Sequence, residues 1–327
     1  MNLDSDVGAK HTNSRKSRLF RWASLVIVLV LFGVYLVANL SKFKPILHLR
    51  VPLLALIALT DVAIIFSNGF FTKFIVRPFD IALKIPESFY LSLISSIGNF
   101  LAPAGTGFVL RAIYLKRKYS LAYVNYGSTL FGNYVIILFF NSLAGLISLL
   151  LIGEKHNNQS DILALVFVLI LIFSLGVTLI KIPFIKPKQV ADKFAARVLR
   201  TIHKVSLGWK QIISHPKLLW QLSGIAVVNL AFSILAVWLI ILSLHLHANF
   251  GPLLLFGVLS SLSIFINITP ANLGIKEAVY IFSSNILGFS ISQILLIALV
   301  DRGVQFLVLA IGWLAAGKKT LGSLKSA

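Results

Sequence analysis

Long apolar runs recur along most of the chain. About 20 helical residues are needed to cross ~30 Å of hydrocarbon, and helices are the spanning elements that satisfy their own backbone groups. Six runs have this length: residues 22–40, 51–70, 123–152, 162–182, 218–244 and 291–316. The pattern predicts an all-α polytopic membrane protein with six full transmembrane helices, residues 22–316 forming a single transmembrane domain.

Two further apolar regions are interrupted by Pro and Gly. Residues 88–115 are broken at 102–107, and residues 252–288 are broken at 269–274. Because Pro removes a backbone donor and Gly loosens a helix, we expect each region to form two short helical arms around its break. The fold class therefore adds two broken re-entrant hairpins to the six spans.

The two breaks are similar in sequence. The first contains Ser95-Ser96, Pro103-Ala104, Gly107 and Arg111-Ala112-Ile113-Tyr114, and the second contains Ser260-Ser261, Pro270-Ala271, Gly274 and Glu277-Ala278-Val279-Tyr280. The order and most spacings agree at an offset of about 166 residues. This indicates an internal repeat, with halves at about 51–182 and 218–316.

Composition supports membrane embedding and excludes several kinds of chemistry. The chain is 58% apolar and 12% charged, with a mean hydropathy of +0.92, whereas a soluble domain is about a quarter charged. It has no Cys, which excludes disulfides and thiolate metal sites. His245 and His247 lack a third nearby ligand, and no phosphate loop or nucleophile elbow occurs. We therefore expect no metal, no cofactor and no enzymatic activity.

The net charge of +20 is typical of nucleic-acid binding, but its distribution argues against a nucleic-acid partner. The basic residues lie in short loops, which is the positive-inside pattern. If both broken regions return to their own side, 24 of the 30 basic residues face the cytoplasm and four face out. This places the basic N-terminus (1–21) and the tail (317–327) in the cytoplasm. It also makes the halves inverted repeats, an arrangement typical of transporters with a site near the midplane.

Ionisable residues within the apolar regions are the candidates for function. Asp61 lies in the middle of the second run, on one helical stripe with Ile65, Asn68 and Thr72. A charge at the bilayer centre costs roughly 2.5–3.5 kcal/mol on insertion scales, so it usually faces a cavity or a partner. Two interpretations stay open: these residues line a substrate cavity, or they pair and pin the helices. The predicted substrate-binding residues are Asp61, Pro103, Gly107, Arg111, Pro270, Asn272, Gly274, Lys276, Glu277, Asp301 and Arg302.

The repeat makes a more specific prediction for two of these residues. Arg111 and Glu277 occupy equivalent places in the two halves, so an inverted arrangement should bring them together near mid-membrane as a buried pair. Asn125, Thr129 and Asn133 share another helical face, for which we expect hydrogen bonds to a neighbouring helix.

The segment between the halves, residues 186–217, is amphipathic and basic. Apolar residues recur there at spacings of three or four, with basic residues between them. This pattern predicts an interfacial helix whose Lys193, Arg197, Arg200 and Lys204 contact anionic lipid headgroups, although an ordinary basic connector is the alternative.

The two breaks also resemble the signatures of a known family. Residues 103–112, from Pro103 through Gly107 to Arg111, resemble its first signature; residues 270–278, followed by Arg302, resemble its second. The family is that of the lysylphosphatidylglycerol synthase transmembrane region, which includes the flippase portion of the bacterial multiple peptide resistance factor. This chain departs from it in having Phe108 in place of an acidic residue and Ala271-Asn272 in place of Gly-Gly.

The resemblance implies an inner-membrane lipid translocase that moves a charged-headgroup phospholipid or a polyprenyl-linked lipid. Arg111 and Arg302 would attract a phosphate, while Glu277 and Asp61 would balance these charges or meet a cationic headgroup. Only a short segment follows residue 316, so the aminoacyl-transfer domain of the family's synthases is not expected. The alternative is a non-transporting scaffold subunit with a lipid-modifying enzyme or glycosyltransferase as its partner.

Overall fold

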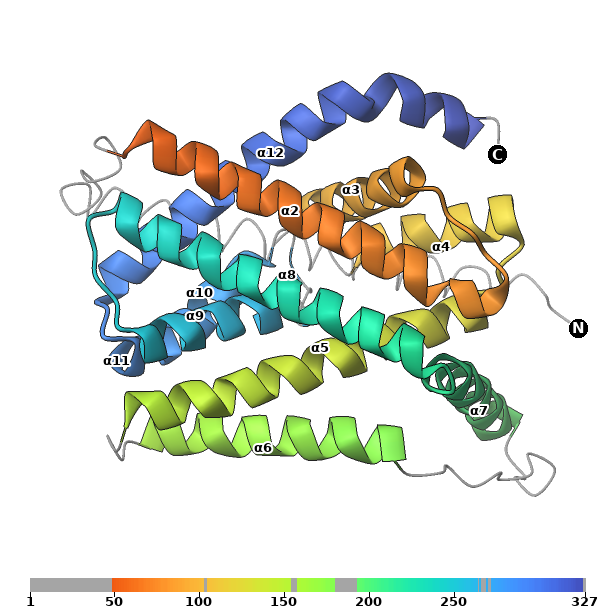
Figure 1. Ribbon diagram of the computed structural model, residues 1–327, viewed down its shortest axis with the longest axis horizontal. Helices are drawn as coiled ribbons and strands as arrows, with labels where there is room; N and C mark the ends of the chain where they lie inside the picture. Colours follow the sequence, from red (N-terminus) through yellow and green to blue (C-terminus); the bar gives the residue numbers. More distant parts are fainter. Residues whose placement is uncertain are drawn as a thin grey trace, which may run out of the picture.

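The computed structural model describes residues 49–102, 105–153, 158–179, 193–263, 265, 269 and 272–325. The first predicted span (22–40), Pro103 and Pro270 lie outside these residues. The elements are α2 (Val51–Ile75), the 3₁₀ helix η2 (Arg77–Phe79), α3 (Ile85–Leu101), α4 (Thr106–Tyr119), α5 (Tyr123–Ile152), α6 (Asn158–Leu179), α7 (Lys193–Ile213), α8 (Pro216–Ser243), α9 (Phe250–Ser263), α10 (Ile275–Phe282), α11 (Ser284–Leu287) and α12 (Ile291–Lys325). All regular secondary structure among the described residues is thus helical, which confirms the all-α fold class (Figure 1).

Five of the predicted spans are confirmed. The helices long and apolar enough to cross a membrane are Val51–Phe79, Tyr123–Ile152, Asn158–Leu179, Pro216–Ser243 and Ile291–Ala315. Their outward side chains are large and apolar, as on α6, where Leu165 and Ile172 are exposed. Such surfaces suit lipid as the surrounding solvent. One boundary differs: α12 continues to Lys325, so most of the predicted tail extends the last helix.

Both broken regions form pairs of short helices, as predicted. In the first, α3 ends at Leu101 and α4 begins at Thr106, with Gly105 in the left-handed region at φ 68°. In the second, α9 ends at Ser263 and α10 begins at Ile275, with Asn272 at φ 54° and Gly274 at φ 83°. Left-handed backbone interrupts a helix, and Gly and Asn are the residues that adopt it most readily.

Four helices of each half follow one another in the same order, and the two sets run in opposite directions. Helices α2, α3, α4 and α5 correspond in sequence to α8, α9, α10 and α12. In Figure 1, α2 runs antiparallel to α8, which it contacts extensively, and α5 runs opposite to α12. The α3–α4 arms therefore enter from one end of the bundle and the α9–α10 arms from the other. Their inner ends approach each other near the centre, as an inverted repeat requires.

The segments richest in basic residues gather at one end of the bundle. The C-terminal ends of α2, α4 and α12 lie there with η2 and α7 (Figure 1). This is the grouping that the charge distribution predicted. The opposite end carries the start of α2, the end of α5, the start of α6 and the connection from α8 to α9.

The predicted amphipathic segment forms α7, and half of it packs on protein. Trp209 and Ile212 are buried, and a Cβ on Gly132 of α5 would lie 2.8 Å from the Trp209 ring. The C-terminal half of the apolar face is therefore covered by α5, a protein contact that the sequence did not predict. Lys204 is exposed. Lipid contact by Lys193, Arg197, Arg200 and Lys204 stays a prediction.

Glu87, outside the five spanning helices, ties the start of α3 to the end of α4. Its carboxylate accepts hydrogen bonds from the Tyr114 hydroxyl (2.7 Å), the Lys118 ammonium (2.8 Å) and the Tyr119 hydroxyl (2.8 Å). Burial acts to raise the pKa of Glu87, but the hydrogen bonds from Lys118, Tyr114 and Tyr119 outweigh it and hold the pKa below its ordinary value. The outer ends of the hairpin are thus joined by a charged contact.

We expect Glu87→Gln to lower stability at neutral pH by roughly 1.5–3 kcal/mol, the range for hydrogen bonds to a charged group. A depressed pKa stabilises the folded state above the unfolded-state pKa near 4, and this contribution disappears as pH falls through the folded-state pKa. The melting temperature of the wild type in detergent should therefore fall below about pH 4, with a flatter curve for Glu87→Gln. Parallel curves for the two proteins would contradict this role.

Candidate functional site

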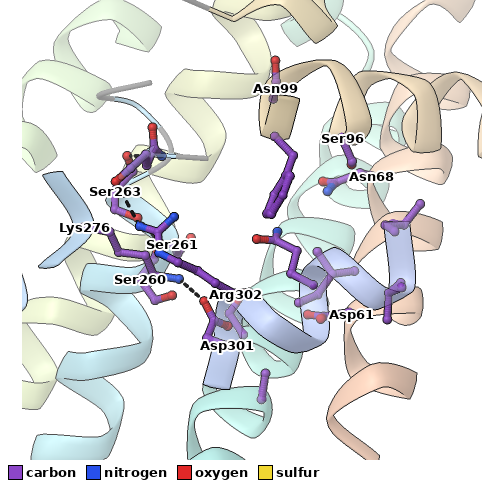
Figure 2. A pocket seen from close by; sticks show the side chains of 18 of the residues that line it. Asp61, Asn68, Ser96, Asn99, Ser260, Ser261, Ser263, Lys276, Asp301 and Arg302 are labelled. Atoms are coloured by element: carbon purple, nitrogen blue, oxygen red, sulfur yellow. Dashed lines mark hydrogen bonds and ion pairs between the residues drawn. The ribbon is translucent and has the colours of Figure 1, made fainter. Parts of the chain in front are cut away.

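A polar cavity of about 230 Å³ lies where the inner ends of the two hairpins meet. Figure 2 shows residues of α2 on one side, the end of α3 above, and residues of α9 and α10 on the other side. The polar residues that line it are Asp61, Asn68, Ser96, Asn99, Asn229, Ser233, Ser260, Ser261, Ser263, Asn272, Lys276, Asp301, Arg302 and Gln305. Both halves therefore contribute to one polar cavity, which we call the central cavity.

Two adjacent ion pairs join α10 to α12 on one wall of the central cavity. Lys276 Nζ lies 2.6 Å from Asp301 Oδ2, and Arg302 Nη2 lies 2.6 Å from Glu277 Oε1. Arg302 Nε also donates to Glu277 Oε1 at 2.8 Å. Consecutive residues of one helix thus pair with consecutive residues of the other. These four charges therefore pair with one another between the two helices, and three of them also face the cavity.

The second break is built around the same charges. Glu277 Oε2 accepts the backbone N–H of Gly274 at 2.8 Å, which caps the N-terminus of α10, where a negative charge is favoured. Arg302 Nη2 donates to the Asn272 carbonyl at 3.1 Å, and Asn272 Nδ2 donates to the Ser263 carbonyl at 3.0 Å. The left-handed turn is therefore fixed by side chains of the break itself, of α10 and of α12, and by a backbone carbonyl of α9.

Asp61 faces this wall from α2 and has a different environment. Its Oδ2 is buried and makes no hydrogen bond within the described part of the chain. Asp301 and Lys276 are within electrostatic range of it, and Asn68, two turns further along α2, accepts a hydrogen bond from Asn229 of α8 at 3.0 Å. Asp61 thus lines a polar cavity, and one of its carboxyl oxygens has no hydrogen-bond partner among the described residues.

A second polar cavity of about 90 Å³ adjoins the first. Asn68, Ser96, Asn99 and Ile137 line both. Arg111 lies in this second cavity, where its Nε donates to Ser95 Oγ at 3.0 Å. No carboxylate among the described residues forms an ion pair with it. The predicted stripe Asp61, Ile65, Asn68 and Thr72 lies along the two cavities in order.

The predicted pair of Arg111 and Glu277 does not form, so that prediction is wrong. Glu277 is held by Arg302 and by the backbone of Gly274, and Arg111 is held by Ser95. The physical reason is that α10 packs against α12 of its own half, which brings a nearer cation to Glu277. Glu277 therefore belongs to the ion pairs between α10 and α12, and Arg111 belongs to the second cavity.

Two other predicted residues have roles that the sequence did not reveal. Gly107 lines neither cavity; it lies in the contact between α3 and α4, and its N–H donates to Asn99 Oδ1 at 2.9 Å. Thr129 was expected to bond to a neighbouring helix, but its hydroxyl donates to Tyr126 of its own helix, at the second cavity. Phe108, the departure from the first family signature, packs edge-on against Tyr134 at that cavity.

Sequence reasoning missed several cavity residues, notably Asn229, Ser233 and Gln305. Asn229 and Ser233 are one turn apart in the apolar run that forms α8, so a polar pair at this spacing was the available signal. Gln305 follows Arg302 by one turn of α12 in the same way.

The fold and the cavity define a polytopic helical membrane protein in which two oppositely directed broken helices meet at a charged site. The sequence profile of the family described as lysylphosphatidylglycerol synthase TM region matches residues 21–312. The chain therefore belongs to this family, which indicates a role connected with membrane lipids. No curated protein matches the chain.

Proposed function

We propose that this protein is a lipid translocase that moves a charged-headgroup phospholipid or a polyprenyl-linked lipid between the leaflets of a bacterial or archaeal inner membrane. The observation that supports this most is the central cavity, formed jointly by two broken helices that enter from opposite ends. Interrupted helices within a membrane are tolerated where they line a cavity, and paired ones mark substrate sites in inverted-repeat transporters.

The charges suggest how a headgroup would be handled. The pairs Lys276–Asp301 and Arg302–Glu277 keep one wall in place and leave Lys276 and Arg302 beside the cavity. Arg111, with no carboxylate partner in the described chain, would receive a phosphate in the second cavity. Asp61 would meet a cationic group or balance the positive charge. Because the two cavities share lining residues, a headgroup would pass from one charged site to the other.

The orientation that follows from this proposal places the end that carries α7 and the basic helix termini in the cytoplasm. Anionic lipids of the cytoplasmic leaflet attract basic segments. Movement of the α3–α4 hairpin would then open the site to that side, and movement of α9–α10 to the other.

The test is lipid movement in reconstituted vesicles. Vesicles of phosphatidylglycerol and phosphatidylethanolamine would carry acyl-labelled fluorescent phosphatidylglycerol, and dithionite would report the fraction reaching the outer leaflet. We expect the protein to raise this fraction above that of protein-free vesicles, with the lipid recovered unaltered. Asp61→Asn should reduce the rate at least about tenfold, the effect of losing one charge-assisted contact.

The matched control is Asp80→Asn. Asp80 is exposed at φ 60°, a conformation that Asn also tolerates, and lies outside both cavities. It should move lipid at the wild-type rate. If the folded wild type moves no lipid but co-purifies with a lipid-modifying enzyme or glycosyltransferase, the scaffold function is correct instead. Chemical conversion of the lipid by the protein alone would indicate an enzyme.

A further inference from the structure

An apolar groove lies between α3 and α12, beside the central cavity. It has a volume of about 240 Å³ and is lined by Ile97, Leu101, Phe306 and Trp313, together with Phe100 and Leu309. Its lining is almost purely apolar, in contrast to the polar cavity next to it. Leu101 and Phe306 are more than half exposed, so the groove opens on the outer surface of the bundle.

The groove and the central cavity share part of their lining. Phe100 and Leu309 contact both spaces, and the rings of Phe100 and Phe306 lie 6.2 Å apart across α3 and α12. The polar residues Asp301, Arg302 and Gln305 of α12 lie at the cavity, and the apolar residues of the next turns lie at the groove. A single helix thus passes from a charged site to an apolar site that faces the membrane.

We propose that this groove holds one hydrocarbon chain of the transported lipid while the headgroup occupies the central cavity. This inference rests on the proposed function and adds an apolar part to the same lipid-binding site, whose polar part is the central cavity. The ligand class is an amphipath with a charged headgroup and an acyl or prenyl chain, because only such a molecule matches both spaces at once. A soluble anion would leave the groove unused, and an uncharged lipid would leave the charged cavity unmatched.

The balance of forces gives a distinctive prediction. Lipid tails are as apolar as Leu, so moving a chain from the bilayer into the groove gains little hydrophobic energy. Occupancy must therefore come from the headgroup, whose charge-assisted contacts hold the attached chain in place. The groove should be occupied by charged lipids and largely ignored by uncharged lipids with identical chains.

The experiment uses the full chain in phosphatidylcholine nanodiscs with two photoreactive probes. One is phosphatidylglycerol with a diazirine on an acyl chain, and the other is diacylglycerol with the same chain. After illumination, mass spectrometry of peptides would locate the adducts. We expect phosphatidylglycerol to label the α3 and α12 groove residues at least roughly tenfold more than diacylglycerol does, the ratio that one charge-assisted contact supports. Both probes should label α6 equally.

A groove-filling variant, Ala310→Trp, should remove the groove adducts and leave those on α6 unchanged. Ala310 lines the groove and not the central cavity. Leu169→Trp, on the exposed face of α6, is the matched control and should keep the groove adducts. If Ala310→Trp does not fold, the comparison of the two probes on the wild type still decides the matter.

Equal groove labelling by the two probes would show ordinary boundary lipid and overturn the inference. Labelling by neither would show that the groove is filled by protein, either another part of this chain or a second copy, and would overturn it equally. Labelling is measured at equilibrium and requires no transport. Selective groove labelling without lipid movement would therefore support lipid-chain binding in the groove and refute the translocase function. Lipid movement without selective labelling would refute lipid-chain binding in the groove and leave the translocase function standing.

Discussion

Replacing Gly107 by Ala is expected to prevent the α3–α4 hairpin from closing and to destabilise the protein by more than about 3 kcal/mol, beyond the usual cost of overpacking. A Cβ at this position would lie 1.8 Å from the Ser95 carbonyl oxygen on the facing arm. That atom belongs to the backbone, so relief requires the two helices to separate. Separation would also break the hydrogen bond from Gly107 N–H to Asn99 and move Ser95 away from Arg111.

Gly224→Ala is the control for this variant. Gly224 lies within α8, and a Cβ there meets no atom within 4 Å. Ala should be neutral or stabilise the helix by up to about 1 kcal/mol, because Ala has the higher helix propensity. Melting in detergent, followed by fluorescence-detected size exclusion, distinguishes the two variants. Equal melting temperatures for Gly107→Ala and Gly224→Ala would show that the close approach of α3 and α4 is not needed for folding.

Replacing Lys276 by Met is expected to cost roughly 3–5 kcal/mol, since it leaves a mostly buried Asp301 without its cation. The Lys276 ammonium also lies 5.7 Å from the centre of the Tyr280 ring, a contact that would be lost too. Asp301→Leu alone should be similarly harmful, because it leaves Lys276 unpaired. The double variant Lys276→Met/Asp301→Leu should recover most of the stability, since an apolar pair avoids the desolvation of both charges.

The comparison for this pair is Lys118→Met, which breaks the contact with Glu87. The Lys118 side chain is 46% exposed, against 15% for Lys276, so water replaces most of what is lost. Its effect should be within about 1 kcal/mol. Melting temperatures of the four variants measure the coupling between the partners. A Lys276→Met protein as stable as Lys118→Met would mean that the pair does not hold α10 to α12.

The elements were predictable from the sequence because each leaves a strong local signal. Apolar runs of spanning length gave α2, α5, α6, α8 and α12, and the Pro- and Gly-containing breaks gave the two hairpins. The helical stripe from Asp61 to Thr72 correctly indicated the side of α2 that faces the cavities. Periodicity within one helix was sufficient for these predictions.

Pairing between helices was not predictable in the same way. The repeat correctly gave equivalent positions to Arg111 and Glu277, but equivalence does not determine which neighbour each side chain meets. The contact of α10 with α12 decides that Glu277 pairs with Arg302, 25 residues along the chain. The apolar groove was equally hidden, because Phe306 and Trp313 have the same sequence pattern as residues that face lipid. The role of Gly107 depends on the facing backbone of α3, which no local pattern specifies.

If lipid moves through the polar space between the two hairpins, a bulky side chain at Ser96 should block it. Ser96 lines both cavities, so Ser96→Trp would place a large ring where they adjoin. The measurement is the dithionite assay of phosphatidylglycerol movement, on protein that elutes as a single folded species, with Leu169→Trp as the control. We expect lipid movement by Ser96→Trp to fall to the rate of protein-free vesicles, while Leu169→Trp keeps the wild-type rate. Wild-type movement by a folded Ser96→Trp protein would contradict movement of lipid through this space.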